Sequence, residues 1–140
     1  MVDLAHKGKV YLAFEFTIER GKVNEFVLAI DDPNPVYLEE SPPLPPTFAT
    51  VLTFWGGANL AGYLAEIDVE IFNVLHAEQE YEYLAALKVG DTITGQTRIE
   101  DIYVKEGRSG KMEFVQFETE FNNQHGELAI KDRALIIVRG

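Results

Sequence analysis

With 140 residues, of which 46% are hydrophobic and 25% charged, the chain is long enough to bury one core, so we expect residues 1–140 to form a single domain. The net charge of −11 excludes nucleic acid and anionic lipid as main partners, because both bind through basic surfaces. The chain has no cysteine, which excludes disulfide bonds and thiolate metal sites.

The first segment predicts a strand followed by a helix. Residues Met1–Val10 contain no apolar run of signal-peptide length, so we expect a cytoplasmic protein. Apolar residues occupy alternate positions between Lys9 and Ile18, which predicts a strand with one buried face formed by Val10, Leu12, Phe14, Phe16 and Ile18. Over Arg20–Ile30 the apolar spacing changes to three, four and seven, which predicts an amphipathic helix.

A polar loop follows this helix. Residues 31–37 read Asp-Asp-Pro-Asn-Pro-Val-Tyr. Pro33 and Pro35 prevent the helix from continuing and restrict the backbone on either side of them. We therefore expect a rigid loop that presents Asp32 and Asn34.

The stretch Ser41–Ala65 carries no charge, and we expect the rest of the chain to be arranged around it. It opens with four prolines and then predicts a helix that begins near Pro46 or Thr47, apolar on all sides and therefore buried on all sides. A membrane span is the alternative, because the run is close to the length that crosses a bilayer. Three glycines, three threonines and Asn59 dilute it, and no Lys or Arg cluster flanks it, which favours a helix inside a globular protein without contact to a membrane.

The second half predicts four strands. Asn73–Leu84 alternates strictly, so Leu75, Ala77, Gln79, Tyr81 and Tyr83 should share one face and Val74, His76, Glu78, Glu80 and Glu82 the other. A turn at Val89–Asp91 precedes three further runs, Thr92–Lys105, Lys111–Asn122 and Glu127–Val138, joined by the glycine-containing links 106–110 and 123–126. The order predicts an α+β domain in which a curled antiparallel sheet wraps the long central helix.

Three segments resemble the hot dog fold, and within it the MaoC-like hydratase and dehydratase superfamily. That superfamily has a loop of Asp, any residue, Asn, Pro, any residue and His, and residues 32–37 match every fixed position except the last, which is Tyr37. Pro45–Phe48 resembles the entry to the family's central helix. The run from His76 to Tyr83, followed by Val89–Asp91, resembles its N-terminal-type, fatty-acid-synthase-like dehydratase branch.

The resemblance implies reversible addition of water to the 2,3 double bond of an enoyl thioester carried on coenzyme A or acyl carrier protein. In that family the loop Asp and His activate the water, and a backbone amide at the start of the central helix binds the thioester oxygen. A helix start supplies such donors. Because prolines have no amide hydrogen, the candidates are the amides of Thr47, Phe48 and Ala49.

The residue types set the candidate roles. Asp32 is the candidate base or an ordinary turn carboxylate, and Asn34 shapes the loop or orients Asp32. Tyr37 can donate a hydrogen bond, but a phenol of pKa near ~10 cannot accept a proton as imidazole does at neutral pH. His76 would be a replacement base only if a β-bulge turned it away from the glutamates, and Gln79 is either a core amide or part of the pocket.

The remaining polar residues give weaker signals. Lys105, Arg108 and Lys111 predict a solvated turn, with a contact to coenzyme A phosphates as the alternative. His6 and His125 fall in terminal and turn contexts. There is no metal-ligand spacing, phosphate-binding glycine loop or nucleophile elbow, so we expect neither metal nor cofactor.

Three functions remain open. The first is a hydro-lyase with Asp32, Tyr37 and His76 as catalytic residues and Asn34, Thr47, Phe48, Ala49 and Gln79 as substrate-binding residues. The second is a non-catalytic subunit that partners a MaoC-like chain with an intact Asp and His loop. The third is a hot dog thioesterase, which the lack of an acidic residue between Ser41 and Ala65 disfavours. In each case we expect a homodimer or heterodimer, because pairing of edge strands extends the sheet.

Overall fold

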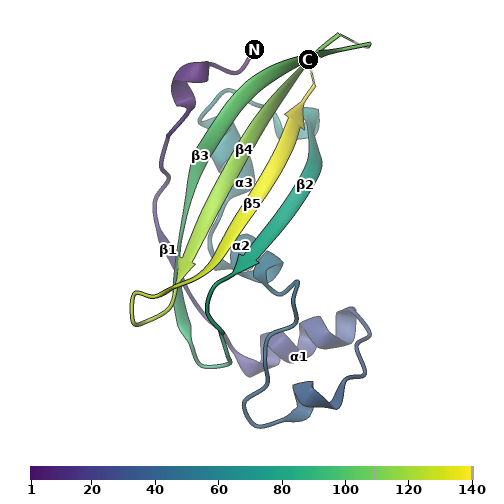
Figure 1. Cartoon of the computed structure of the whole chain (residues 1–140), viewed down its shortest axis with the longest axis vertical. Coiled ribbons are helices and arrows are strands. Elements are labelled where there is room, and N and C mark those ends of the chain that lie inside the picture. The colour runs from purple at the N-terminus through teal and green to yellow at the C-terminus, as the bar shows by residue number, and fades with distance from the viewer. Residues whose placement is uncertain (109, 140) are drawn as a thin grey trace.

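A five-stranded antiparallel sheet forms the centre of the protein, with helices on one of its faces (Figure 1). The computed structural model describes residues 1–108 and 110–139. The spatial strand order is β1-β3-β4-β5-β2, and the strands are β1 (Phe14–Thr17), β2 (Val74–Tyr83), β3 (Thr92–Gly107), β4 (Gly110–Asn122) and β5 (Leu128–Val138). The helices are α1 (Arg20–Ala29), α2 (Ala49–Gly56) and α3 (Leu60–Ala65). The predicted α+β architecture is confirmed.

The three long strands form where the sequence alternates. In β3 the inward residues Ile93, Thr97 and Ile99 are buried, and a register shift after Ile99 keeps the apolar Ile102 inside. The predicted runs 92–105, 111–122 and 127–138 differ from β3, β4 and β5 by two residues or fewer at each end. In the predicted link 106–110, residue 109 lies outside the described part of the chain.

The central helix differs from the prediction, because two short helices replace one long one. Gly57 has a φ of 130°, which ends α2, and the side chain of Asn59 accepts a hydrogen bond from the amide of Gly62 at 3.1 Å, which starts α3. The expectation of burial on all sides is also wrong. Leu52 is fully buried against the sheet, whereas Phe54 and Trp55 are 58% and 71% exposed.

The first strand also differs from the prediction, because β1 covers only its second half, and the first half is reduced to an isolated bridge between Val10 and Arg98 of β3. Between Val10 and Phe14, the side chains of Val10, Leu12 and Ala13 are exposed, and that of Tyr11 is buried. Tyr11 stacks on Tyr63 with ring centroids 4.0 Å apart and donates a hydrogen bond to the Tyr63 carbonyl at 2.9 Å. This stacking turns Tyr11 inward and reverses the predicted faces before Phe14, whereas Ile18 is buried as predicted.

Helix α1 and the turn Pro35–Leu38 project beyond one end of the sheet (Figure 1). The predicted helix is confirmed as α1, in which Val23 is fully buried and Phe26 packs edge-on against Phe48, with centroids 5.6 Å apart. Ile30, the last residue of the predicted apolar face, lies past the end of α1 and is 43% exposed. The loop after α1, which contains Asp32, therefore lies at this end of the molecule.

Candidate functional site

A cavity of about 50 Å³ lies between the helices α2 and α3 and the inner face of the sheet. Its apolar wall includes Phe54, Leu60, Phe117 and Ile136. Its polar residues come from α2, α3 and the strands β2, β3, β4 and β5. Besides Tyr63 and the hydrogen-bonded pair Thr97–Thr119, they are Thr50, Thr53, His76, Gln79, Tyr81 and Asp132. Because His76 and Gln79 are exposed on the edge strand β2, the cavity meets solvent along that edge.

Asp132 is a carboxylate inside this cavity and is only 4% exposed. One of its oxygens accepts a hydrogen bond from the Thr53 hydroxyl at 2.7 Å, and the other accepts one from the side-chain amide of Gln79. Burial raises the pKa of the Asp132 carboxyl above its usual value, although the hydrogen bonds from Thr53 and Gln79 act in the opposite direction. The carboxylate thereby links α2 to β5 and β2.

A second polar pair lies beside Asp132. The hydroxyls of Thr50 and Tyr81 are 2.5 Å apart, and burial raises the pKa of Tyr81, so this phenol is neutral at physiological pH. Thr50 and Thr53 share one face of α2 because they are three residues apart. This face of α2 therefore presents two hydroxyls to the cavity.

The position of His76 corrects the strict alternation predicted for this strand. The pairing of β2 with β5 shifts register between His76 and Glu78. As a result His76 lines the cavity together with Gln79 and Tyr81, whereas Ala77 lies with Glu78 on the opposite face. The expectation that His76 shares a face with the glutamates is wrong, because the bulge inserts Ala77 and reverses the faces before it.

In the loop that contains Asp32, two side chains accept hydrogen bonds from backbone amides of the same loop. The carboxylate of Asp32 accepts from the amide of Asn34 at 3.0 Å, and the side chain of Asn34 accepts from the amide of Val36 at 3.1 Å. Tyr37 is buried, at 8% exposure. Asp32 and Tyr37 line a groove beside α1 that has no lining residue in common with the α2 cavity. The fold of one chain therefore separates Asp32 and Tyr37 from His76 and Gln79.

The three amides predicted to bind the thioester oxygen, at the start of α2, differ in whether they already donate a hydrogen bond to the backbone. The Phe48 amide donates to the carbonyl of Pro45 at 2.9 Å, so a turn already uses it. Among the described residues, the amides of Thr47 and Ala49 have no backbone acceptor. Thr47 is exposed and Ala49 buried. Of the three, Thr47 and Ala49 are thus the amides with capacity to bind a ligand.

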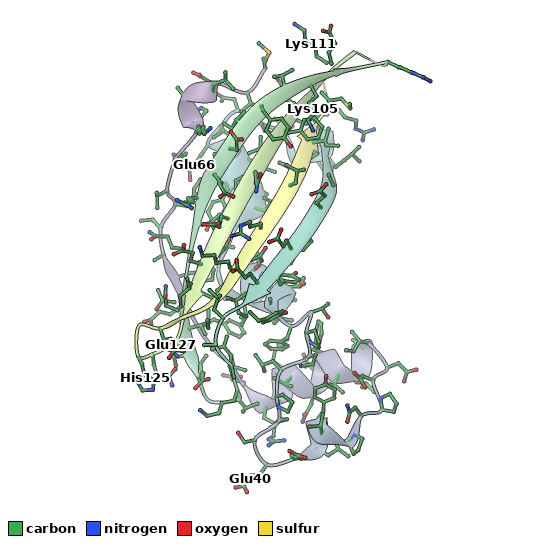
Figure 2. All side chains as sticks on the ribbon, viewed as in Figure 1. Glu40, Glu66, Lys105, Lys111, His125 and Glu127 are labelled. Carbon is green, nitrogen blue, oxygen red and sulfur yellow. The ribbon has the colours of Figure 1, made fainter. Side chains whose placement is uncertain are left out.

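The basic hairpin lies far from the Asp32 loop. Figure 2 shows Lys105 and Lys111 at one end of the molecule and Glu40, which follows the turn Pro35–Leu38, at the other. The ammonium group of Lys105 lies 5.3 Å from the ring centroids of both Tyr103 and Phe114. These cation–π contacts agree with the simpler interpretation of a solvated surface turn.

Sequence reasoning missed Asp132, Thr50, Thr53 and Tyr81 as members of one site. For Asp132 a signal was present, because it is the one charged residue among the inward positions of β5, namely Ile130, Asp132, Ala134, Ile136 and Val138. A carboxylate within such an apolar series is rarely left without a partner. The partners Thr53 and Gln79 are distant in sequence and needed the fold to identify them.

Comparison with known proteins decides the family. A family model described as "FAS1-like, dehydratase domain region" matches residues 5–132. The chain belongs to this family. A UPF0336 protein of Thermobifida fusca is 31% identical over 99% of this chain and 95% of its own length, and a UPF0336 protein of Streptomyces avermitilis is 26% identical over the same shares. The resemblance to MaoC-like dehydratases is confirmed.

Solved structures show the same hot dog fold. The HadBC complex, a (3R)-hydroxyacyl-ACP dehydratase of Mycobacterium tuberculosis, contains a chain that matches with a TM-score of 0.76 at 20% identity, over 94% of this chain and 96% of that one. The ChsH1–ChsH2 complex of the same organism matches with a TM-score of 0.75 at 17% identity, over 94% and 84%. A MaoC-like dehydratase matches with a TM-score of 0.80 at 17% identity, over 96% of this chain and 42% of that one.

Two further observations concern the described part of the chain. Within residues 1–108 and 110–139, no helix is both long and apolar enough to cross a membrane. Within the same ranges, no three His, Cys, Asp or Glu side chains form a cluster that could hold a metal ion.

Proposed function

We propose that this chain is the acyl-binding subunit of a two-chain hydro-lyase, which hydrates an enoyl thioester or dehydrates a 3-hydroxyacyl thioester on coenzyme A or acyl carrier protein. The α2 cavity holds the acyl group, and a second MaoC-like chain supplies the catalytic Asp and His. The family of the chain supports the reaction class. The mainly apolar cavity, with a few polar groups that can fix orientation, supports the binding role.

The main support for the proposal is that the loop of residues 32–37 lacks the histidine of the family's loop. Hydration needs a base for the water, a proton for the α-carbon and donors for the developing enolate oxygen. Tyr37 stands where the family's loop has His and cannot serve as a base at neutral pH. The Asp32 carboxylate accepts a hydrogen bond from its own loop and lies in a groove separate from the acyl cavity. In this proposal Asp32 and Asn34 shape the loop, and the base comes from the partner.

The exposed surface supports a partner at β2. Within the described part of the chain, this strand of ten residues pairs only with β5, so its other edge has unpaired backbone groups. Phe54 and Trp55 of α2 are exposed large aromatics, which are common in interfaces. A partner that pairs with β2 would cover the open side of the cavity.

Charge favours a different chain over a second copy. Glu78, Glu80 and Glu82 are exposed along β2, and pairing two copies through β2 would bring both sets of glutamates together. Arg133 contacts Glu80 at 2.6 Å and Glu82 at 3.2 Å, but among the described residues Glu78 has no ion pair. A partner with Lys or Arg on its matching strand removes this repulsion. HadBC and ChsH1–ChsH2 are themselves complexes of two named chains.

The test combines this chain with a MaoC-like chain that carries the intact Asp and His loop. We expect a stable complex on analytical ultracentrifugation, and hydration of crotonyl-CoA by the complex but by neither chain alone. Fast hydration by the pure homomer would contradict the proposal. The double substitution Glu78→Gln and Glu82→Gln removes the like charges that would face each other, so it should strengthen self-association and weaken the mixed complex.

A second candidate is a self-sufficient hydro-lyase. The observation in its favour is the bulge that places His76 in the cavity with Asp132, so that an imidazole and a carboxyl share one site. In this case the pure chain hydrates crotonyl-CoA, and His76→Gln lowers kcat by about 100-fold or more. Asp32→Asn is the matched control and should leave the rate unchanged. Equal rates for His76→Gln and the unaltered chain would exclude His76 as the base.

A further inference from the structure

We propose that Tyr63 sets the length of the acyl chain that the α2 cavity accepts, because its ring closes the end of the cavity that lies away from β2. The limit is an acyl group of about four carbons. The inference rests on the proposed function, since it assumes that the cavity holds the acyl part of a thioester. It adds the size of the acyl group, which the reaction leaves open, and it holds whichever chain supplies the catalytic base.

The α2 cavity crosses the sheet from β2 toward β3. Its open side lies at β2, where His76 and Gln79 are exposed. Its lining also includes Thr97 of β3, which is separated from β2 by β5 and β4 in the spatial order of the sheet. An acyl chain that enters beside β2 therefore advances over β5 and β4 toward β3.

Tyr63 of α3 lies at the β3 end of this path. It lines the cavity together with Thr97, and Tyr11, whose ring stacks on that of Tyr63, donates its backbone amide to the Thr97 carbonyl at 2.9 Å. The Tyr11 hydroxyl also donates to the Tyr63 carbonyl, at 2.9 Å. Both tyrosines are buried, with exposures of 9% for Tyr63 and 4% for Tyr11. Two buried, stacked rings that hydrogen bonds connect to α3 and β3 form a fixed wall.

A second space lies behind this wall. It is the N-terminal groove, of about 660 Å³, which is lined by residues 10–14 with Gly57, Tyr63, Glu66 and Gln96. Of the residues that the structure describes, Tyr63 alone lines both the cavity and the groove. Leu12 is 90% exposed in this groove, so an apolar surface faces water there. The side chain of Tyr63 therefore separates the acyl cavity from a much larger apolar space.

The volume of the cavity gives the chain length. A dry cavity of about 150 Å³ holds one benzene ring, so the α2 cavity of about 50 Å³ holds roughly two carbon atoms. With the thioester carbonyl and the α-carbon at the open side, these are the next two carbons of the acyl chain. An acyl group of about four carbons fills the space, and the tail of a longer one meets the ring of Tyr63.

The test compares butyryl-CoA with octanoyl-CoA, by isothermal titration calorimetry on the full chain and on its two-chain complex. We expect the unaltered protein to bind octanoyl-CoA no more tightly than butyryl-CoA, because the additional carbons find no space. Tyr63→Ala removes the ring and joins the cavity to the N-terminal groove. Each methylene that leaves water raises affinity about fourfold, so this variant should bind octanoyl-CoA about 10- to 100-fold more tightly than the unaltered protein does, with butyryl-CoA changed less than about threefold.

Further variants identify the wall and the path behind it. Tyr63→Phe is the matched control, because it keeps the ring and should keep the length limit. Tyr63→Leu serves if Tyr63→Ala does not fold, and should raise the affinity for octanoyl-CoA at least about threefold. Leu12→Glu, added to Tyr63→Ala, places a charge in the groove at an exposed position. It should lower the affinity for octanoyl-CoA about tenfold and leave that for butyryl-CoA unchanged.

The outcomes separate this inference from the proposed function. Tighter binding of octanoyl-CoA than of butyryl-CoA to the unaltered protein overturns the inference and leaves the acyl-binding role intact. An unchanged ratio of the two affinities in both Tyr63→Ala and Tyr63→Leu also overturns it, as does a gain that Leu12→Glu fails to reduce. If neither thioester binds to the chain or to the complex, the acyl-binding role fails and the inference fails with it.

Discussion

Replacing Arg133 by alanine tests how the outer face of the sheet holds β2, the strand that borders the cavity. The guanidinium of Arg133 contacts Glu118 of β4 at 3.0 Å and Glu80 and Glu82 of β2 at 2.6 and 3.2 Å. Glu118 is 1% exposed, and its other partner is Arg98 at 2.6 Å. Arg133 therefore joins β2 to the interior of the sheet across β5.

The structure sets the size of the effect. Loss of the hydrogen bond to the buried, charged Glu118 costs about 1.5–3 kcal/mol. The contacts to the exposed Glu80 and Glu82 add at most about 1 kcal/mol together, because solvent screens them. We expect Arg133→Ala to lower the free energy of unfolding by about 2–3 kcal/mol at pH 7. The measurement is urea denaturation followed by circular dichroism.

The pH dependence gives a second check. Burial by itself would raise the pKa of Glu118, but hydrogen bonds and ion pairs with Arg98 and Arg133 lower it below the usual 4.5. A carboxyl with a lowered pKa in the folded state stabilises the protein above the unfolded pKa and loses that contribution as pH falls through the folded value. The cost of Arg133→Ala should therefore be full above pH 4.5 and should shrink as the pH falls below it.

The controls make this prediction refutable. Arg98→Ala removes the other partner of Glu118 and should show the same pH dependence. Lys131→Ala removes a 4.0 Å contact with Glu120 and only a longer-range attraction to Glu118, so it should change stability by less than about 0.5 kcal/mol. A cost for Arg133→Ala as small as that of Lys131→Ala at pH 7, or one that is constant down to pH 3, would refute the reasoning.

Three other predictions follow from the cavity and the helix break. Burial raises the pKa of Asp132 in the folded protein, so the charged carboxylate lowers the stability as the pH rises above 3.8, the pKa in the unfolded chain. We therefore expect Asp132→Asn to be more stable than the unaltered protein above that pH and not below it. Urea denaturation at a series of pH values measures this difference. Gly57→Ala should lower the free energy of unfolding by about 1–3 kcal/mol, because φ at Gly57 is 130° and a new Cβ would lie 3.0 Å from Phe14. The control Gly8→Ala should lower it less in the same assay, because φ at Gly8 is 84° and a new Cβ would have no atom within 4 Å. Ala134→Leu should fill the cavity and abolish butyryl-CoA binding by calorimetry; unchanged affinity would place the acyl group elsewhere.

The sheet could be predicted from the sequence because its long strands bury one face. Residues such as Ile93, Thr97 and Ile99 alternate with exposed ones, and this period survives in the folded protein. The order of elements and the helix α1 followed from the same kind of pattern. The resemblance of residues 32–37 to the MaoC-like loop then pointed to the correct family.

The details that depend on tertiary contacts could not be predicted. The bulge at Ala77 has no local signal, yet it moves His76 from the glutamate face into the cavity. The break at Gly57 lies within an uncharged stretch that reads equally well as one helix. Tyr11 turns inward only because Tyr63, more than fifty residues away in sequence, offers a ring and a carbonyl. Asp132 becomes part of a site only when α2 supplies Thr53.

The origin of the catalytic base is the claim to test most directly. In the two-chain complex, the aspartate of the partner's loop and Asp32 of this chain can each be replaced by asparagine, and kcat for crotonyl-CoA hydration measured for both. We expect the partner's substitution to lower kcat by about 100-fold or more, and Asp32→Asn to change it less than twofold. A large loss from Asp32→Asn with little loss from the partner's substitution would contradict the account.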